Sequence, residues 1–151
     1  MREALAGAVA AAEAGEVPVG AVVVRAGIPI ASAANRTVRD QDPTAHAETL
    51  AIRAAAAALG RWRLDDCTLV VTLEPCAMCA GAVVLARLAR VVFGAWDGKA
   101  GMAGSVGDLL RHPRLNHRPE VRGGVLADEC GAALREFFIT RRGAPTEEPA
   151  R

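Results

Sequence analysis

The sequence predicts an α/β fold in which helices cover both faces of a mixed sheet. Short β-branched segments alternate with longer alanine-rich segments along most of the chain, a pattern typical of helices that connect strands. The first two β-branched segments are separated only by a glycine-containing turn, which indicates that the sheet also contains an antiparallel hairpin. The length of 151 residues suits a single domain.

The chain is expected to open with a helix up to Ala14. Alanine favours helices, and Gly15 favours a helix end. Residues 17–25 are rich in valine and lead into Ala26-Gly27, and residues 28–33 then resume the apolar pattern. These two segments therefore predict the hairpin.

A second helix is expected over residues 45–59, which are again rich in alanine. Thr44 is a residue type that caps helix N-termini, and Gly60 suits a left-handed C-terminus. Residues 68–73 are apolar and β-branched, so they predict the strand that follows this helix.

The second half of the chain continues the alternation. Pro75 suits the first turn of a helix that is expected to run to Leu88. A strand is predicted over residues 91–93, a short helix near residues 106–110 and a last strand over residues 120–122. Asp128 can then start a final helix that continues to Arg142.

Composition limits the class of protein. Residues 1–142 are expected to form one domain, and residues 143–151, with two prolines, a flexible tail. No apolar stretch approaches the roughly 20 residues that span a bilayer, and no signal-peptide pattern opens the chain. Four cysteines are too few for a disulfide framework. A cytoplasmic protein without membrane contact is therefore expected.

Charge is distributed unevenly, although the net charge is only +1. Residues 86–142 carry ten Lys or Arg against six Asp or Glu. This half is where a phosphate-bearing partner would bind, while an arginine-rich solvated surface is the alternative interpretation.

The chemistry is concentrated at the starts of two predicted helices, in His46-Ala47-Glu48 and in Cys76-Ala77-Met78-Cys79. One imidazole and two thiolates are the ligand set of a zinc site with an open fourth position. Zinc in such a site lowers the pKa of a water ligand from about 15.7 to about 7. Glu48, beside the metal, can then act as the general acid and base of a hydrolysis.

Two other interpretations of the cysteine pair stay open. A closed structural zinc site would need a fourth ligand, and Cys67, Cys130, His112 and His117 are the candidates. Closed sites usually pair two closely spaced ligand couples, whereas here the partner is a single histidine with a nearby glutamate. A redox dithiol is the other alternative, but it would need neither His46 nor Glu48.

The His-x-Glu and Pro-Cys-x-x-Cys pattern resembles the zinc-dependent nucleoside and nucleobase deaminases, and most closely the bacterial tRNA-specific adenosine deaminases. The resemblance covers about residues 1–142. It rests on the segments Glu16-Val17-Pro18-Val19-Gly20-Ala21-Val22, Asn35-Arg36, Asp42-Pro43-Thr44-Ala45-His46-Ala47-Glu48, Thr72-Leu73-Glu74-Pro75-Cys76, Met78-Cys79-Ala80-Gly81-Ala82, Arg90-Val91-Val92-Phe93-Gly94-Ala95, Gly104-Ser105, Asn116-His117-Arg118 and Leu126-Ala127-Asp128-Glu129-Cys130.

This resemblance implies a three-layer α/β/α fold of the cytidine deaminase type, with a mixed five-stranded sheet. It implies one Zn²⁺ per subunit on His46, Cys76 and Cys79, with Glu48 as the catalytic residue. The implied reaction converts adenosine to inosine at the wobble position (34) of a tRNA, typically an arginine tRNA, and releases ammonia. The implied partners are the tRNA anticodon stem-loop and a second subunit, in a homodimer.

The same resemblance implies roles in substrate binding. Asn35 would hold the target nucleoside, and Val19 and Ala47 would line the base pocket. Asp97 and Lys99 would touch the anticodon, and Phe138 and Arg141 would lie near the RNA at the end of the last helix. The alternatives are a turn role for Asn35, a core role for Val19, and a helix anchor with a dipole-compensating basic end for the last helix.

Trp96 and Met102 depart from the pattern of these deaminases, so the rim of the substrate site is expected to differ. Two other functions also remain open. One is deamination of a small molecule such as guanine, cytosine or a nucleoside, and the other is a non-catalytic, zinc-stabilised RNA-binding subunit. Glu48 argues against the latter, because a structural zinc site needs no carboxylate beside the metal.

Overall fold

The computed structural model describes residues 1–143. Residues 144–151, and with them nearly all of the expected tail, lie outside the described part, and the domain boundary at residue 142 stays a prediction. No helix of the described part is long and apolar enough to cross a membrane. The elements in chain order are α1(Arg2–Glu13), β1(Gly20–Arg25), β2(Ile28–Ala34), α2(Ala47–Leu59), β3(Cys67–Leu73), α3(Ala77–Ala86), β4(Arg90–Ala95), β5(Glu120–Arg122) and α4(Ala127–Arg142).

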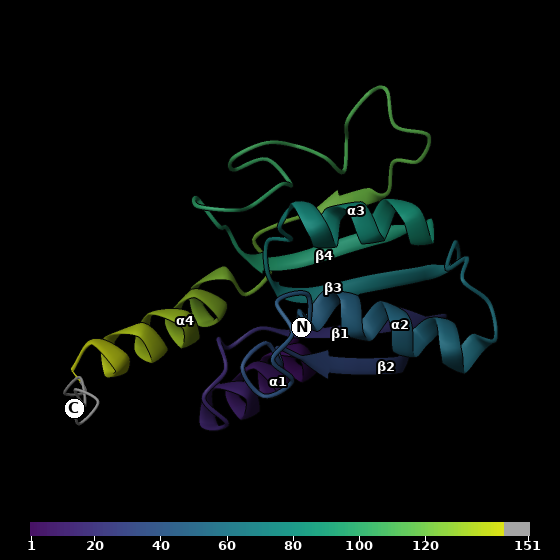
Figure 1. Cartoon of the computed structure of the whole chain (residues 1–151). Helices are drawn as coiled ribbons and strands as arrows, with labels where there is room; N and C mark the ends of the chain where they lie inside the picture. Colours follow the sequence, from purple (N-terminus) through teal and green to yellow (C-terminus); the bar gives the residue numbers. More distant parts are fainter. Residues whose placement is uncertain (144–151) are drawn as a thin grey trace.

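The predicted mixed sheet is confirmed. Its five strands lie in the order β2-β1-β3-β4-β5 (Figure 1). Strands β1 and β2 form the expected antiparallel hairpin, and β1 also pairs antiparallel with β3. Strands β3, β4 and β5 run parallel. Helix α3 connects β3 to β4, whereas a long loop connects β4 to β5.

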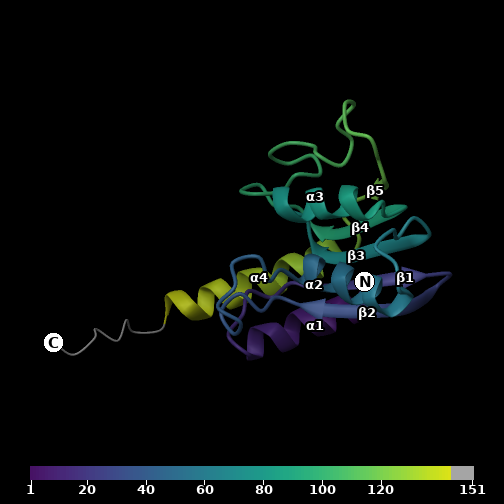
Figure 2. The same ribbon diagram turned by 45° about the vertical axis from the view of Figure 1, so that its right-hand side comes forward.

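Helices cover both faces of this sheet, as predicted (Figures 1 and 2). A Cβ added to Gly20 of β1 would meet Ala4 of α1, and one added to Gly94 of β4 would meet Cys130 of α4, so α1 and α4 share a face. The alternate residues of β1, Ala21 and Val23, lie in the core cluster that includes α2 and α3.

Two helices begin later than the sequence predicts. Thr44 does not cap α2, because its N–H and hydroxyl both donate to Asp42 Oδ1 at 2.8 and 2.7 Å. His46 is the N-cap residue instead, with an extended backbone. Cys76 is likewise the N-cap residue of α3, so Pro75 precedes that helix. The end predicted at Leu88 is wrong as well, because Arg87 adopts a left-handed conformation and terminates α3 at Ala86.

The short helix expected near residues 106–110 does not form. That segment is a series of turns with an isolated β-bridge between Ala103 and Asp108. The N–H of Val106 donates to the Gly101 carbonyl oxygen and that of Leu109 to the Met102 carbonyl oxygen, each at 2.9 Å. Hydrogen bonds to the preceding loop therefore take the place of hydrogen bonds within the segment. The buried carboxylate of Glu74 in turn holds that loop, because it accepts the N–H groups of Ala103 and Ser105.

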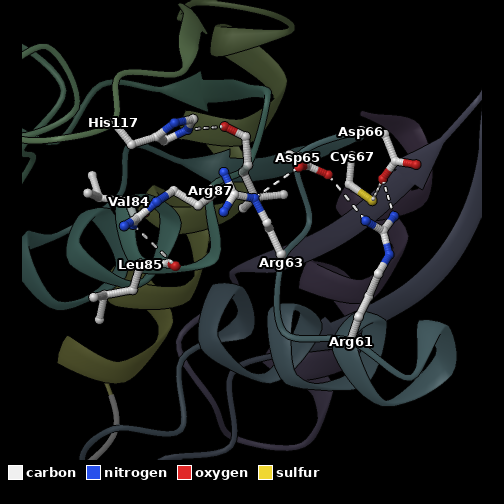
Figure 3. A network of polar contacts seen from close by, with 10 residues as sticks. Arg61, Arg63, Asp65, Asp66, Cys67, Val84, Leu85, Arg87 and His117 are labelled. Atoms are coloured by element: carbon white, nitrogen blue, oxygen red, sulfur yellow. Dashed lines mark hydrogen bonds and ion pairs between the residues drawn. The ribbon is translucent and has the colours of Figure 1, made fainter.

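A polar network joins the segments that lead into β3 and β4, at the end of the sheet where these two strands begin (Figure 3). Arg61 pairs with Asp66, and Arg63 with Asp65. Here His117 Nε2 lies 2.7 Å from the Leu88 carbonyl oxygen. Several arginines of the chain therefore compensate acidic side chains of the protein itself.

Candidate metal centre and active site

The first turns of α2 and α3 lie beside the carboxyl end of β3, at the end of the sheet opposite the polar network of Arg61 and Arg63 (Figure 1). His46 is the N-cap of α2, and Glu48 lies in its first turn. Cys76 is the N-cap of α3, and Cys79 lies in its first turn. The fold therefore brings the two predicted motifs together, although about thirty residues separate them in the sequence.

His46, Cys76 and Cys79 form a group that fits a zinc ion. The Nδ1 atom of His46 lies 3.6 Å from the Sγ atom of each cysteine. A tetrahedral zinc with bonds of about 2.3 Å to sulfur and about 2.05 Å to nitrogen requires a nitrogen-to-sulfur distance of about 3.6 Å. The three donors are thus already at the spacing of zinc ligands, through Nδ1 of the histidine.

No fourth histidine, cysteine or acidic ligand joins this group within residues 1–143. Cys67 and His117 belong to the network at the far edge of the sheet (Figure 3). Three protein donors leave one position of a tetrahedral zinc free, which is the arrangement of catalytic rather than structural sites.

The side chains of Cys76, Cys79 and His46 shift one another's pKa values. The thiol of Cys79 and the imidazole of His46 stabilise the Cys76 thiolate and lower the pKa of Cys76 to about 3. The same contact, together with burial, raises the pKa of Cys79, and the contact with Cys76 raises the pKa of His46. This polarisation matches a site that accumulates thiolate for a cation.

Glu48 lies beside these donors and is buried. Burial raises the pKa of its carboxyl group to about 7, and the nearby His46 opposes that rise. Both groups line one cavity, so the carboxylate faces the same space as the donor set.

The cavity beside the donors has a volume of about 220 Å³. Three of the predicted substrate-binding residues, Val19, Asn35 and Asp97, contribute to its wall. Asn35 is fixed in orientation, because its Oδ1 accepts the N–H of Ala47 at 2.8 Å. The complete lining consists of Val17, Val19, Asn35, Thr37, His46, Glu48, Leu73, Glu74, Cys76, Asp97 and Ala100.

Four other predicted substrate residues do not line this cavity. Ala47 is fully buried, and Lys99 is exposed in the loop beside it. Phe138 is 43% exposed on α4, whose C-terminal half extends beyond the sheet in both views (Figures 1 and 2). Arg141 donates to the Gly15 carbonyl and lies over the Phe137 ring, so it helps to hold α4 to the turn after α1.

Two buried carboxylates at the rim of the cavity were not predicted from the sequence. Glu16 accepts hydrogen bonds from Thr37 Oγ1 and from the N–H groups of Val38 and Arg39. Glu74 accepts hydrogen bonds from the loop after β4. Acidic residues inside otherwise apolar segments, Glu16 before Val17 and Glu74 after Leu73, were the available signal.

The family model of the cytidine and deoxycytidylate deaminase zinc-binding region matches residues 1–95. The chain belongs to this deaminase family. It is therefore a zinc-dependent deaminase, and its His46, Cys76 and Cys79 are the group that can hold one zinc ion.

Several known proteins are similar to this chain over most of its length. The tRNA-specific adenosine deaminase of Bacillus subtilis is 54% identical over 138 residues, which cover 91% of this chain and 86% of that protein. A solved structure from a study of A-to-I editing by tRNA:A34 deaminases at the wobble position superimposes with a TM-score of 0.86 at 45% identity, covering 89% of this chain and 97% of the other. The guanine deaminase of Nitrosomonas europaea superimposes with a TM-score of 0.79 at 29% identity, covering 91% and 82%.

Proposed function

We propose that this deaminase converts adenosine to inosine at the wobble position (34) of a tRNA, an arginine tRNA, and releases ammonia. The observation that carries the proposal is the cavity in which Glu48, Asn35 and the zinc donors His46 and Cys76 face one small space. The likeness to the Bacillus tRNA-specific adenosine deaminase supports the choice of substrate over other members of the family.

We assign the zinc to His46, Cys76 and Cys79. When bound, zinc supplies a Lewis acid that makes a water molecule a nucleophile at neutral pH. Glu48 would accept one proton from this water and deliver it to N1 of the adenine ring, while the water oxygen forms a bond to C6. Glu48 would then take the second proton from the new hydroxyl group on C6 and pass it to the amine. The bond between C6 and the amine nitrogen would break, so that ammonia leaves and the C6 carbonyl group of inosine forms.

The cavity walls suit one unstacked purine. A volume of about 220 Å³ lies below the range of about 300–1,000 Å³ typical for drug-sized ligands. The target base must therefore leave its stack and enter alone. The Oδ1 atom of Asn35 is engaged by Ala47, so its Nδ2 amide is the group available to donate to the nucleoside, while Val19 packs against the base beside the buried Ala47.

The anticodon stem-loop is proposed to bind across the rim beside Asp97. Lys99, exposed two residues further on, supplies a positive charge for a phosphate. Phe138 is exposed enough to stack on an unpaired base, and Arg141, close to the end of the same helix, adds charge there. We further propose that the enzyme works as a homodimer in the cytoplasm.

A second candidate is a deaminase of free guanine. It is favoured by the structural similarity to the Nitrosomonas guanine deaminase, at 29% identity. Both reactions use the same metal chemistry, so only the recognition of the substrate separates them.

The test is a substrate panel with zinc measured on the same preparation. The panel contains guanine, cytosine, cytidine, adenosine and an anticodon stem-loop with adenosine at position 34. A matched stem-loop with adenosine moved to position 35 controls for position. The proposal expects inosine only in the first stem-loop with about one zinc per chain. Turnover of guanine with both stem-loops unchanged would establish the second candidate instead.

A further inference from the structure

The side chain of Glu74 is almost completely buried, yet it accepts four hydrogen bonds from one loop. Its Oε2 accepts the N–H of Asp97 at 2.8 Å and the hydroxyl of Ser105. Its Oε1 accepts the N–H groups of Ala103 and Ser105, each at 3.0 Å. Both oxygens are therefore used to hold the two ends of residues 97–105, named here the rim loop.

The rim loop is shaped around this carboxylate. A Cβ added to Gly101 would lie 2.3 Å from both Cδ and Oε2 of Glu74 and 2.6 Å from the Asp97 carbonyl oxygen, so only glycine allows the approach. The N–H of Met102 also donates to the Pro75 carbonyl oxygen at 2.8 Å. These contacts join the loop to the segment that leads into Cys76.

Glu74 connects the metal centre to the substrate cavity. It lies two residues before Cys76, and both residues line the cavity together with Asp97 and Ala100 of the rim loop. A second part of the cavity wall is held in a similar way, because the buried Glu16 accepts the N–H groups of the two residues after Thr37, which also lines the cavity. Buried carboxylates thus hold two segments of the cavity wall.

We propose that Glu74 is a positioning residue that holds the rim loop in its substrate-binding conformation before the substrate arrives. Without it, the loop would have to be ordered at the expense of binding free energy. The inference rests on the proposed function for the identity of the substrate, but the ordering of the loop by Glu74 is independent of it.

Glu74→Gln is the sharpest perturbation, because it keeps the shape and removes one acceptor. If the amide oxygen takes the place of Oε1, the NH₂ group faces the N–H of Asp97, and two donors oppose each other. The opposite orientation would leave the N–H groups of both Ala103 and Ser105 without their acceptor. We expect the Asp97 end of the loop to be released.

The expected kinetic result is a KM for the wobble-adenosine stem-loop that rises about tenfold or more, the effect of re-ordering one or two backbone residues. The kcat should change less than about threefold, with zinc content unchanged. A residue that only supports folding would lower the amount of active enzyme, and hence kcat, without raising KM. Glu120→Gln, an exposed substitution on β5, is the matched control and should match the wild type.

Gly101→Ala perturbs the same contact from the loop side. It should raise KM in the same way, and the double variant with Glu74→Gln should show less than the summed effect, because both changes break one contact.

Amide hydrogen exchange separates this inference from the proposed function. The N–H of Asp97 should exchange at least about tenfold faster in zinc-loaded Glu74→Gln than in the wild type, while the core amides of β3 stay protected. Unchanged protection at Asp97, Ala103 and Ser105 in Glu74→Gln would overturn the positioning role. If the wild type edits the stem-loop, a wild-type KM in Glu74→Gln would overturn it as well. A wild type that leaves the stem-loop unedited would refute the proposed function alone, and the exchange result would still decide the role of Glu74.

Discussion

Asn35 has two separable roles, and two substitutions distinguish them. Its Oδ1 accepts the N–H of Ala47 at 2.8 Å, a bond between buried groups at the start of α2. Its Nδ2 is the atom proposed to hold the nucleoside. Asn35→Ala removes both functions, whereas Asn35→Asp keeps an acceptor for Ala47 and removes the donor.

The stability effect follows from burial. Asn35→Ala leaves the Ala47 N–H without a partner, which costs about 1–3 kcal/mol. With a denaturant slope of about 2 kcal/mol per molar, the urea midpoint should fall by about 0.5–1.5 M. Asn35→Asp should stay within about 1 kcal/mol of the wild type, because a carboxylate at a helix N-terminus is favourable.

The activity effect should be similar in both variants. Loss of one substrate hydrogen bond worth about 1–3 kcal/mol lowers kcat/KM roughly 5- to 150-fold. Inosine formation on the stem-loop measures it, and fluorescence of the two tryptophans follows unfolding. Wild-type kcat/KM in Asn35→Asp would refute the donor role, and a wild-type urea midpoint in Asn35→Ala would refute the contribution of the bond to Ala47.

Three further predictions concern stability and RNA binding. Burial alone would raise the pKa of Glu16, but hydrogen bonds from Arg39, Val38 and Thr37 outweigh it and lower the pKa below 4.5. The stabilisation by Glu16 is therefore complete above pH 4.5 and is lost as the pH falls through the lowered folded-state pKa. In urea titrations, Glu16→Gln should be less stable than the wild type by about 1–3 kcal/mol at neutral pH, and this difference should shrink in acid. A stability difference that does not depend on pH would contradict this. Gly20→Ala would place a Cβ 1.9 Å from the Ala4 carbonyl oxygen, so the free energy of unfolding should fall by about 3 kcal/mol or more, and an unchanged melting temperature would argue against this packing of α1. Lys99→Ala should weaken stem-loop binding and reduce the slope of log K against log salt by about 1. Arg63→Ala, at the end of the sheet far from the cavity, should leave this slope unchanged. Equal slopes in the wild type and Lys99→Ala would refute the proposed contact between Lys99 and a phosphate.

The sequence predicted the layers of the fold because hydrophobic periodicity is a local signal. The hairpin was recognisable from Ala26-Gly27, and the alternation of β-branched and alanine-rich segments was enough to predict a mixed sheet with helices on both faces. The predicted start of α2 was wrong because a residue distant in the sequence accepts the hydrogen bond expected of a local helix cap. Asn35, twelve residues before Ala47, takes the helix N–H that a local cap at Thr44 would have taken.

The helix predicted in the loop after β4 was wrong for a related reason. Residues 106–110 had an acceptable local pattern for a short helix, but the N–H groups of Val106 and Leu109 donate to the carbonyl groups of Gly101 and Met102, in the loop that Glu74 holds in place. No property of the local sequence reports a buried acceptor 29 or more residues away.

The group that can hold a zinc ion was predictable from the sequence, because ligand type and spacing indicate its chemistry. His46, Cys76 and Cys79 need only two helix starts to meet, and the fold brings these together. Glu16 and Glu74 were not predicted, because a single glutamate usually lies on the surface. Their importance depends on which loops fold over them, and this is a property of the tertiary structure.

The most direct test of the account is single-turnover inosine formation by zinc-loaded Glu48→Gln on the stem-loop with adenosine at position 34. The variant should keep about one zinc per chain, because Glu48 is not among the donors at zinc-ligand spacing, and its rate should fall by at least about 100-fold, the usual contribution of a general acid and base. Wild-type zinc content together with a wild-type rate of inosine formation would contradict the assignment of Glu48 as the proton carrier of this site.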